Sequence, residues 1–434
     1  MSKVTNIIPA KLSSVRFSVC INKSLSLFSN STFLVSRSDN KTNSKKFLIY
    51  IMAKKRIILK FIFVIFLIII FGLFIFYLNN NNIIESHIYE DFDKIAKAYS
   101  NNKFFKSFLD QVKVLRYIYT NCSIENKNIL HISLSLTDNY AYIILVSMES
   151  ILLNCNKNKT FIIFHILCSP DITELSISMI KSLMKKFSSN MRLIFYGMGN
   201  NFIDKKDIGV TQASYYRLIL PIIVNKERII YLDGDTLSLK DLTEMYNSNF
   251  DNNYVLGFLG LTSDGLDYYG IKANNWINAG VLLLNLKKIR EDNKCFDLLN
   301  LAINGTKLFH QDNTVINLAL YPKIGKLPIK YGIWNFFDKL DIIKYSKRLR
   351  QAINISEYEE GIKDPGLIHI VLCHPKAWNL NSHFIKKNTM CQKRNNCDCT
   401  NTQSYNLWHY YAKKTDYYSE IFNYLNKKYK KIKF

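Results

Sequence analysis

The hydrophobic positions of this chain form one long unbroken run and, further on, a series of short runs separated by polar turns. The long run, residues 57–78, reads IILKFIFVIFLIIIFGLFIFYL, with Lys60 as its one charged residue. A helix rises about 1.5 Å per residue, so this run is long enough to cross the roughly 30 Å hydrocarbon core of a bilayer. We expect a single N-terminal transmembrane helix here, and the alternative is a buried core helix.

The charges on the two sides of this run differ in sign. Lys54, Lys55 and Arg56 precede it, whereas Glu85 and Glu90 follow it. Positive residues stay on the cytoplasmic side of a membrane. We therefore expect a single-pass type II protein of the Golgi or ER membrane, with everything beyond the span on the luminal side.

Strands and helices alternate from residue 128 onward. Apolar runs predict strands at 128–137, 160–168, 191–197, 228–232 and from 277. Apolar residues at helical spacing predict helices at 140–154 and 171–187, and a further helix begins near 310. This alternation predicts an α/β domain with a parallel sheet, in which ligands bind at the carboxyl ends of the strands.

The changes in composition divide the chain into five segments. We expect a basic cytoplasmic segment at 1–56, the span at 57–78, a polar stem at 79–127, the α/β catalytic domain at 128–384 and a basic, aromatic-rich tail at 385–434. Residues 1–51 are rich in serine and nearly free of acids, as transit peptides are. Translation that starts at Met52 is the simplest expectation for this segment.

The formal net charge of +24 would by itself suggest a nucleic-acid-binding protein. Most of the excess positive charge lies in residues 1–60 and 385–434, and the chain between them is nearly balanced. Nucleic acid is therefore not an expected partner.

Two carboxylates follow the buried strand at 228–232. Asp233 and Asp235 stand one residue apart, and Gly234 between them lets the backbone turn sharply. Carboxylates held this close repel each other unless a cation lies between them. Oxygen ligands suit Mg²⁺ or Mn²⁺, which can in turn hold phosphates. The motif alone leaves open an exposed turn that caps the next helix.

Further polar motifs stand at the ends of other predicted elements. They are TDNY (137–140), ASYYRLILP (213–221), INAGVLLLNLKKIR (277–290), HQDNTVINLAL (310–320) and GLIHIVLCHPKAWN (366–379). Together with YLDGDTL (231–237), this ordered set resembles glycosyltransferase family 8, the retaining enzymes with a nucleotide-binding GT-A fold. The resemblance covers about residues 128–380 and includes bacterial lipopolysaccharide galactosyl- and glucosyltransferases.

The resemblance implies a metal site and a donor site. Asp233, Asp235 and His369 would hold Mn²⁺, with Mg²⁺ as the alternative, and the ion would grip the diphosphate of a UDP-sugar. Lys376 would add a second positive contact to the phosphates. His374 is a rival ligand, because the spacing between His369 and Lys376 departs from the family's usual form.

The resemblance also assigns the rest of the donor site. The uridine would be held by Asp138, Asn139 and Tyr140. Arg217 would contact the donor or support the metal carboxylates.

The reacting end of the site would be formed by Asn278, Asp312 and Asn313. Asn278 and Asp312 would face the sugar, and Asn313 stands where the family has a glutamine near the reacting carbon. Asp312 is the candidate nucleophile for a double displacement. A same-face displacement guided by the departing phosphate is the rival mechanism.

These features predict a retaining hexosyltransferase that moves glucose or galactose from a UDP-sugar to a glycan, glycoprotein or glycolipid acceptor. Two other classes stay open. One is an inactive family member that acts as a binding or scaffold subunit in the secretory pathway, and the other is a metal-dependent nucleotide hydrolase.

Overall fold

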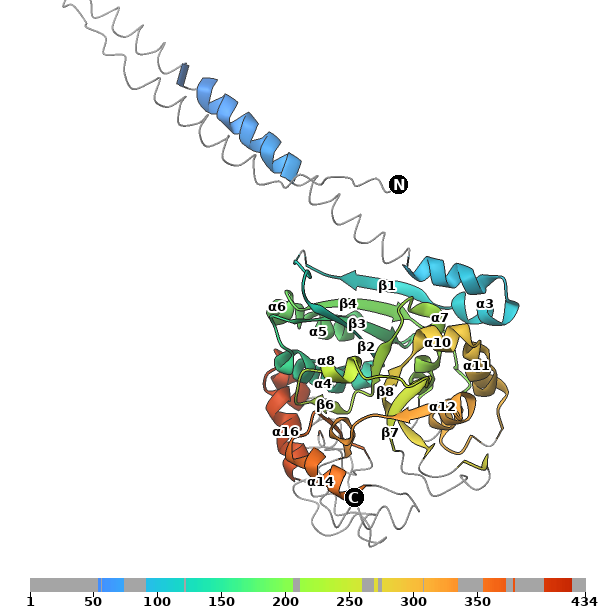
Figure 1. Cartoon of the computed structure of the whole chain (residues 1–434). Coiled ribbons are helices and arrows are strands. Elements are labelled where there is room, and N and C mark those ends of the chain that lie inside the picture. The colour runs from blue at the N-terminus through green and yellow to red at the C-terminus, as the bar shows by residue number, and fades with distance from the viewer. Residues whose placement is uncertain are drawn as a thin grey trace, which may run out of the picture. The chain divides into compact units, whose positions relative to one another are not determined.

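The computed structural model describes residues 54–55, 57–73, 91–120, 122–205, 211–259, 269–271, 275–306, 308–334, 354–371, 378 and 402–423 (Figure 1). The chain divides into two units, 1–81 and 82–434. In the first unit, residues 57–73 are helical and exposed. Across the described residues, the structure holds no helix with both the length and the apolar character that crossing a membrane requires. The span at 57–78 therefore stays a prediction, and residues 74–78 lie outside the described part.

The second unit is built on an eight-stranded sheet. Its strands run in the order β1 (Lys113–Ile118), β4 (Met191–Gly197), β3 (Thr160–Cys168), β2 (Asn128–Leu136), β5 (Ile229–Leu232), β8 (Ile277–Leu284), β7 (Val255–Leu259) and β9 (Ile324–Lys326). The neighbours β4, β3, β2 and β5 are parallel, as the alternating pattern predicts. β8, however, is antiparallel to β5, and β1 is antiparallel to β4. The prediction of a parallel sheet therefore holds for β4, β3, β2 and β5 and is wrong for β8, and β1 lies in the segment predicted as a stem.

Helices cover both faces of this sheet, and each face has its own apolar core. On β4, Leu193 and Phe195 enter one core while Ile194 and Tyr196 enter the other, as the period of a strand requires. The first core includes residues of α4 (Ala141–Asn154), α5 (Glu174–Lys181), α6 (Met184–Phe187), α14 (Ile355–Lys363) and α16 (Thr402–Ala412). The second includes residues of α3 (Lys103–Leu109), the 3-10 helix η3 (Gln212–Ile219), α7 (Leu220–Ile223), α10 (Leu286–Glu291), α11 (Lys294–Asn304) and α12 (Gln311–Leu320).

The helix predicted at 171–187 is two helices. Thr173 caps the start of α5 by accepting a hydrogen bond from the backbone N–H of Ser176. The Ser182 hydroxyl donates to the carbonyl of Met179 at 2.6 Å, next to the break between α5 and α6. A serine that bonds to its own backbone in this way competes with the helical pattern.

A second, three-stranded sheet lies beside the end of β5. It has the order β10 (Ile333–Trp334), β11 (Leu367–His369) and β6 (Thr236–Ser238). β6 begins directly after the two aspartates of the YLDGDTL motif, and β11 pairs with it antiparallel. This small sheet therefore brings a late segment of the chain next to that motif.

The segments on either side of the predicted catalytic domain also pack into it. α3 buries Phe105 and Phe108, and β1 extends the large sheet, although both lie in the predicted stem at 79–127. Burying a phenylalanine side chain contributes about 2–3 kcal/mol, so this part of the segment belongs to the domain. In the predicted tail, α16 contributes the buried Trp408.

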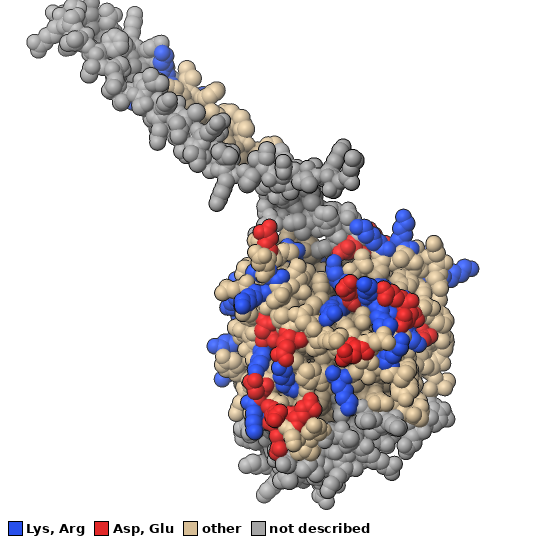
Figure 2. Space-filling view, in the orientation of Figure 1, with Lys and Arg blue, Asp and Glu red and all other residues tan. Residues whose placement is uncertain are grey.

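The face of the domain shown in Figure 2 has a mixed charge. Lysine and arginine side chains lie among aspartate and glutamate side chains over the described part of that face. This agrees with the near balance of charge along the middle of the chain, and the absence of a nucleic-acid partner stays a prediction.

Candidate active site

The two aspartates lie in a loop whose backbone is held by hydrogen bonds to β8 and to Thr236. The backbone N–H of Asp233 donates to the carbonyl of Gly280 on β8 at 2.8 Å, and the Thr236 hydroxyl donates to the carbonyl of Asp233 at 2.8 Å. A Cβ at Gly234 would lie 2.7 Å from Cγ1 of Ile144 on α4. The structure therefore supports a glycine here through close packing against α4, because the φ of Gly234 is not in the left-handed region that favours glycine.

His369 reaches the aspartates through the small sheet. It lies opposite Thr236 in the β11–β6 pair, and the next residue, Ile370, donates its N–H to the carbonyl of Asp235 at 2.8 Å. His369 Nε2 lies 3.1 Å from Asp235 Oδ1 and 3.9 Å from Asp233 Oδ2. One ligand atom from each of the three side chains lies within 4.8 Å of the others.

This arrangement fits a divalent cation. The imidazole is buried, whereas 31% of the Asp233 side chain and 17% of the Asp235 side chain stay exposed, so the acidic side of the cluster faces the cleft. Two carboxylates and one imidazole suit Mn²⁺ or Mg²⁺, with coordination positions left for phosphate oxygens. Gly280 forms the wall behind the cluster, because a Cβ there would lie 2.6 Å from Asp233 Oδ2 and 2.9 Å from His369 Nε2.

We expect Gly280→Ala to lower metal affinity by at least about tenfold, the scale seen when residues around metal ligands are altered. The added methyl group would push two ligand atoms out of place while changing little else. Titration calorimetry with Mn²⁺ and UDP measures this affinity. Gly361→Ala on α14 is the control, because the atoms nearest to its added Cβ belong to Ile329, Lys330 and Ile333, none of which is a proposed ligand. Equal affinities in wild type and Gly280→Ala would contradict the proposed cluster.

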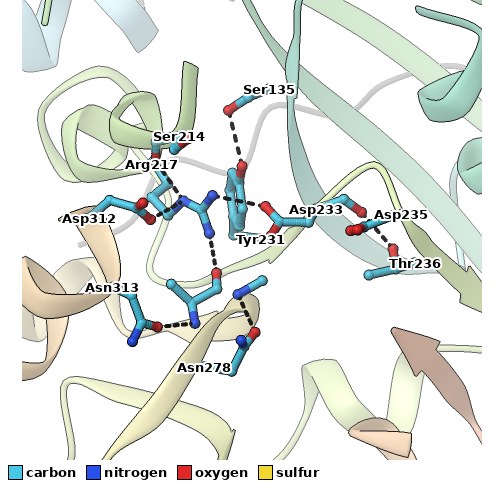
Figure 3. A network of polar contacts seen from close by, with 12 residues as sticks. Ser135, Ser214, Arg217, Tyr231, Asp233, Asp235, Thr236, Asn278, Asp312 and Asn313 are labelled. Atoms are coloured by element: carbon cyan, nitrogen blue, oxygen red, sulfur yellow. Dashed lines mark hydrogen bonds and ion pairs between the residues drawn. The ribbon is translucent and has the colours of Figure 1, made fainter. Parts of the chain in front are cut away.

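Arg217 joins this cluster to Asp312 (Figure 3). Its Nη2 donates to Asp233 Oδ1 at 2.8 Å, and its Nε lies 3.3 Å from Asp312 Oδ2. Its Nη1 donates to the carbonyl of Ala279, and its guanidinium carbon lies 4.1 Å from the centre of the Tyr231 ring. The arginine is buried, and removing one partner of a buried ion pair costs about 3–5 kcal/mol. One cation therefore holds two carboxylates at a fixed separation.

The Asp312 carboxyl group is buried at the start of α12. Burial raises its pKa to about 6, and the nearby Arg217 guanidinium opposes this rise. At neutral pH the group is mostly ionised, so the cleft contains a buried negative charge beside the proposed metal site.

Asn278 and Asn313 line the same cleft, but their amide oxygens bind backbone. Asn278 Oδ1 accepts from the N–H of Gly280 at 2.8 Å, and Asn313 Oδ1 accepts from the N–H of Ala279 at 2.7 Å. Both side chains thus fix the strand that carries Gly280.

The cleft has a volume of about 450 Å³. The predicted site residues that line it are Tyr140, Arg217, Asp233, Asp235, Asn278, Asp312 and Asn313. It is also lined by residues that the sequence reasoning did not assign, which include Ser135, Thr137, Thr211, Ser214, Tyr231, His310 and Gln311. The Tyr231 hydroxyl lies 3.1 Å from the Ser135 hydroxyl, and nothing in the sequence marks this pair except its position at the ends of two strands.

Two of the three predicted uridine-binding residues do not line the cleft. Asp138 Oδ1 accepts hydrogen bonds from the Thr173 N–H at 3.0 Å, the Thr173 hydroxyl at 2.6 Å and the Ser176 hydroxyl at 2.6 Å. These bonds lower the pKa of Asp138, against the opposing effect of burial. Asp138 therefore fixes the start of α5. Asn139 is exposed beside it, whereas Tyr140 does face the cleft.

The late basic motif is only partly described. His369 is placed, but Lys376 and the rival ligand His374 lie outside the described residues. Their roles stay predictions.

The comparisons with known proteins identify the family. The model of glycosyl transferase family 8 matches residues 131–382, more than half of the chain. The chain belongs to glycosyltransferase family 8. It is 29% identical over 259 residues to a provisionally named glycosyltransferase of Haemophilus influenzae, covering 56% of this chain and 73% of the relative. It is 24% identical over 228 residues to the lipopolysaccharide 1,2-glucosyltransferase of Escherichia coli. This match covers 48% of this chain and 64% of that relative.

A solved structure supports the fold of this family 8 glycosyltransferase. The WbbM bifunctional glycosyltransferase has a TM-score of 0.54 and 17% sequence identity, covering 70% of this chain and 53% of that one. This family 8 chain thus spans about half of the neighbour's length. The predicted α/β GT-A fold is confirmed.

Proposed function

We propose that this family 8 member transfers glucose or galactose from a UDP-sugar to a glycan, glycoprotein or glycolipid acceptor, with retention at the anomeric carbon and with a bound Mn²⁺ or Mg²⁺. One observation carries the proposal. Asp233, Asp235 and His369 converge in a cleft where Arg217 links them to the buried Asp312. A scaffold subunit would have no need for this arrangement, in which one buried arginine holds two carboxylates.

The roles of the residues follow from their positions. Asp233, Asp235 and His369 would hold the cation. When bound, the cation would neutralise the charge that develops on the departing diphosphate. Arg217 keeps Asp233 and Asp312 in place, and Asp312 would stabilise positive charge at the anomeric carbon. Tyr140 offers a ring at the rim of the cleft on which a base could stack.

A hexose is supported by the name of the Escherichia coli relative, a glucosyltransferase. The Asn and Asp side chains that line the cleft suit the hydroxyl groups of a sugar.

The test is UDP release by purified 82–434, the unit that contains both cores, against UDP-glucose and UDP-galactose. Each donor is measured with and without Mn²⁺, and with and without a glycan acceptor. Metal-dependent release that an acceptor accelerates supports a transferase. Release that no acceptor changes indicates a nucleotide-sugar hydrolase, and binding of UDP without any release indicates an inactive family member.

We also propose that residues 57–78 anchor the protein in a membrane of the secretory pathway, with the catalytic unit on the far side from the cytoplasm. The support is the apolar run and the basic residues before it. In sealed microsomes, a tag at the C-terminus should resist protease until detergent is added. Digestion of the tag in intact microsomes would reject this sidedness.

A further inference from the structure

The first two turns of α12 are fastened to β8 by two asparagine side chains. Asn313 Oδ1 accepts from the N–H of Ala279 at 2.7 Å (Figure 3). One turn further on, Asn317 accepts from the N–H of Ile277 and donates to its carbonyl, both at 2.8 Å. The resemblance to the family places an amide at position 313 near the reacting carbon. In this chain, the oxygen of that amide is committed to the backbone of β8.

Another amide side chain belongs to the cleft two residues earlier. Gln311 lines the cleft and directly precedes the buried Asp312. Its φ is +46°, in the left-handed region that residues other than glycine, asparagine and aspartate rarely adopt. Such strained positions concentrate at ligand-binding and active sites.

Gln311 differs in residue type from most other residues that have a positive φ. Apart from glycine, positive φ values occur within the described residues at Asn126, Phe202, Asp251, Asn252, Asn293 and Gln311. Gln311 is the one that lines the cleft, and four of the others are the Asn or Asp residues that tolerate this conformation best. Glutamine is not one of the residue types that tolerate this conformation best, and Gln311 lies in the wall of the cleft.

We infer that Gln311 provides an amide that hydrogen-bonds a hydroxyl group of the donor sugar, beside Asn313, whose amide oxygen is held by the backbone of β8. An amide offers both a donor and an acceptor, as a sugar hydroxyl requires. Asp312 follows it immediately, so both side chains would act on the same ring. This inference rests on the proposed function, since it needs a sugar in the cleft.

Gln311→Gly tests the inference, because it removes the amide and also relieves the backbone. We expect kcat/KM for UDP-glucose or UDP-galactose to fall about threefold to tenfold, the scale of one neutral hydrogen bond. The Kd for UDP with Mn²⁺ should stay within about twofold, because UDP lacks the sugar. The Tm should be unchanged or higher, since glycine adopts a positive φ without strain.

Two further variants make the result decisive. Asn252→Gly relieves a φ of +68° at an exposed position outside the cleft and should leave kcat/KM unchanged. Gln311→Asn keeps an amide and should change the ratio of kcat/KM between the two donors, because its shorter side chain reaches the hydroxyl differently. Wild-type kcat/KM for both donors in Gln311→Gly would overturn the inference and show that the strain is only structural. A wild-type enzyme that binds UDP but uses neither donor would instead reject the proposed function.

Discussion

Asp235→Ala should reduce glycosyl transfer by about three orders of magnitude or more and leave the fold intact. The carboxylate is one of three proposed metal ligands, and charge stabilisation by a bound cation supplies several kcal/mol to a transition state. The backbone of this residue is held separately, because its carbonyl accepts from the N–H of Ile370. Loss of the side chain therefore removes a ligand without removing the pairing of the loop with β11.

The stability of the variant gives a second readout. Without metal, the carboxylates of Asp233 and Asp235 repel each other, so Asp235→Ala should unfold at the same temperature as wild type or higher. With Mn²⁺ and UDP at about 100 times the wild-type Kd, wild type should gain about 2.7 kcal/mol, and the variant should gain little. Thermal unfolding with and without ligand measures both quantities. Asp204→Ala, at an exposed carboxylate outside the cleft, should behave as wild type.

The same measurements separate the two candidate histidines. His369→Ala should lose the Mn²⁺-dependent gain in stability, since Nε2 of His369 lies 3.1 Å from Asp235. His374→Ala should keep most of it. The reverse order would assign the third ligand to His374 and require a different arrangement of the residues after β11.

The central strands could be predicted from the sequence because both of their faces are buried. β3 reads TFIIFHILC and β5 reads IIYL, so each appears as a continuous apolar run. β1, KVLRYI, is an edge strand with partly exposed residues, and its sequence resembles the polar segment around it. β6, β10 and β11 are only two or three residues long. Such short strands exist through pairing with distant segments, which periodicity does not reveal.

The antiparallel direction of β8 follows from the connection between β5 and β8, which the hydrophobic pattern did not reveal. A parallel neighbour needs a crossover, usually a helix, to bring the chain back to the same edge. Between β5 and β8 the described residues, which exclude 260–268 and 272–274, instead form β6, the single-turn helix α8 (Thr243–Tyr246) and β7. β8 therefore enters the sheet from the opposite edge, and Asn278 and Gly280 near its start lie beside the end of β5.

In the candidate site, too, the residues that are contiguous in sequence could be predicted, whereas contacts between remote residues could not. Asp233 and Asp235 could be found because strand, turn and acids are contiguous in sequence. The partners that decide roles are remote: Asp138 bonds to Thr173, and Asn313 bonds to Ala279. A residue's position in a motif does not show which of its atoms are already committed to the backbone. The resemblance placed Asp138 in the uridine site and Asn313 at the reacting carbon, and the structure gives Oδ1 of each side chain a partner within the protein.

Asp312→Asn should lower kcat by about two orders of magnitude while leaving UDP affinity within about threefold, because one charge that acts on the sugar is lost and the diphosphate contacts remain. The structure adds a pH signature. The pKa of Asp312 is raised to about 6 by burial, so wild-type kcat should fall as the pH drops through 6, where the carboxylate becomes protonated. In Asp312→Asn this fall in kcat at low pH should be absent.

Steady-state kinetics from pH 5 to 8 and calorimetry with UDP and Mn²⁺ measure the two effects. In this variant Asp233 would be the one carboxylate that pairs with Arg217. A parallel loss of UDP affinity and kcat would show that Asp312 acts by supporting the metal site.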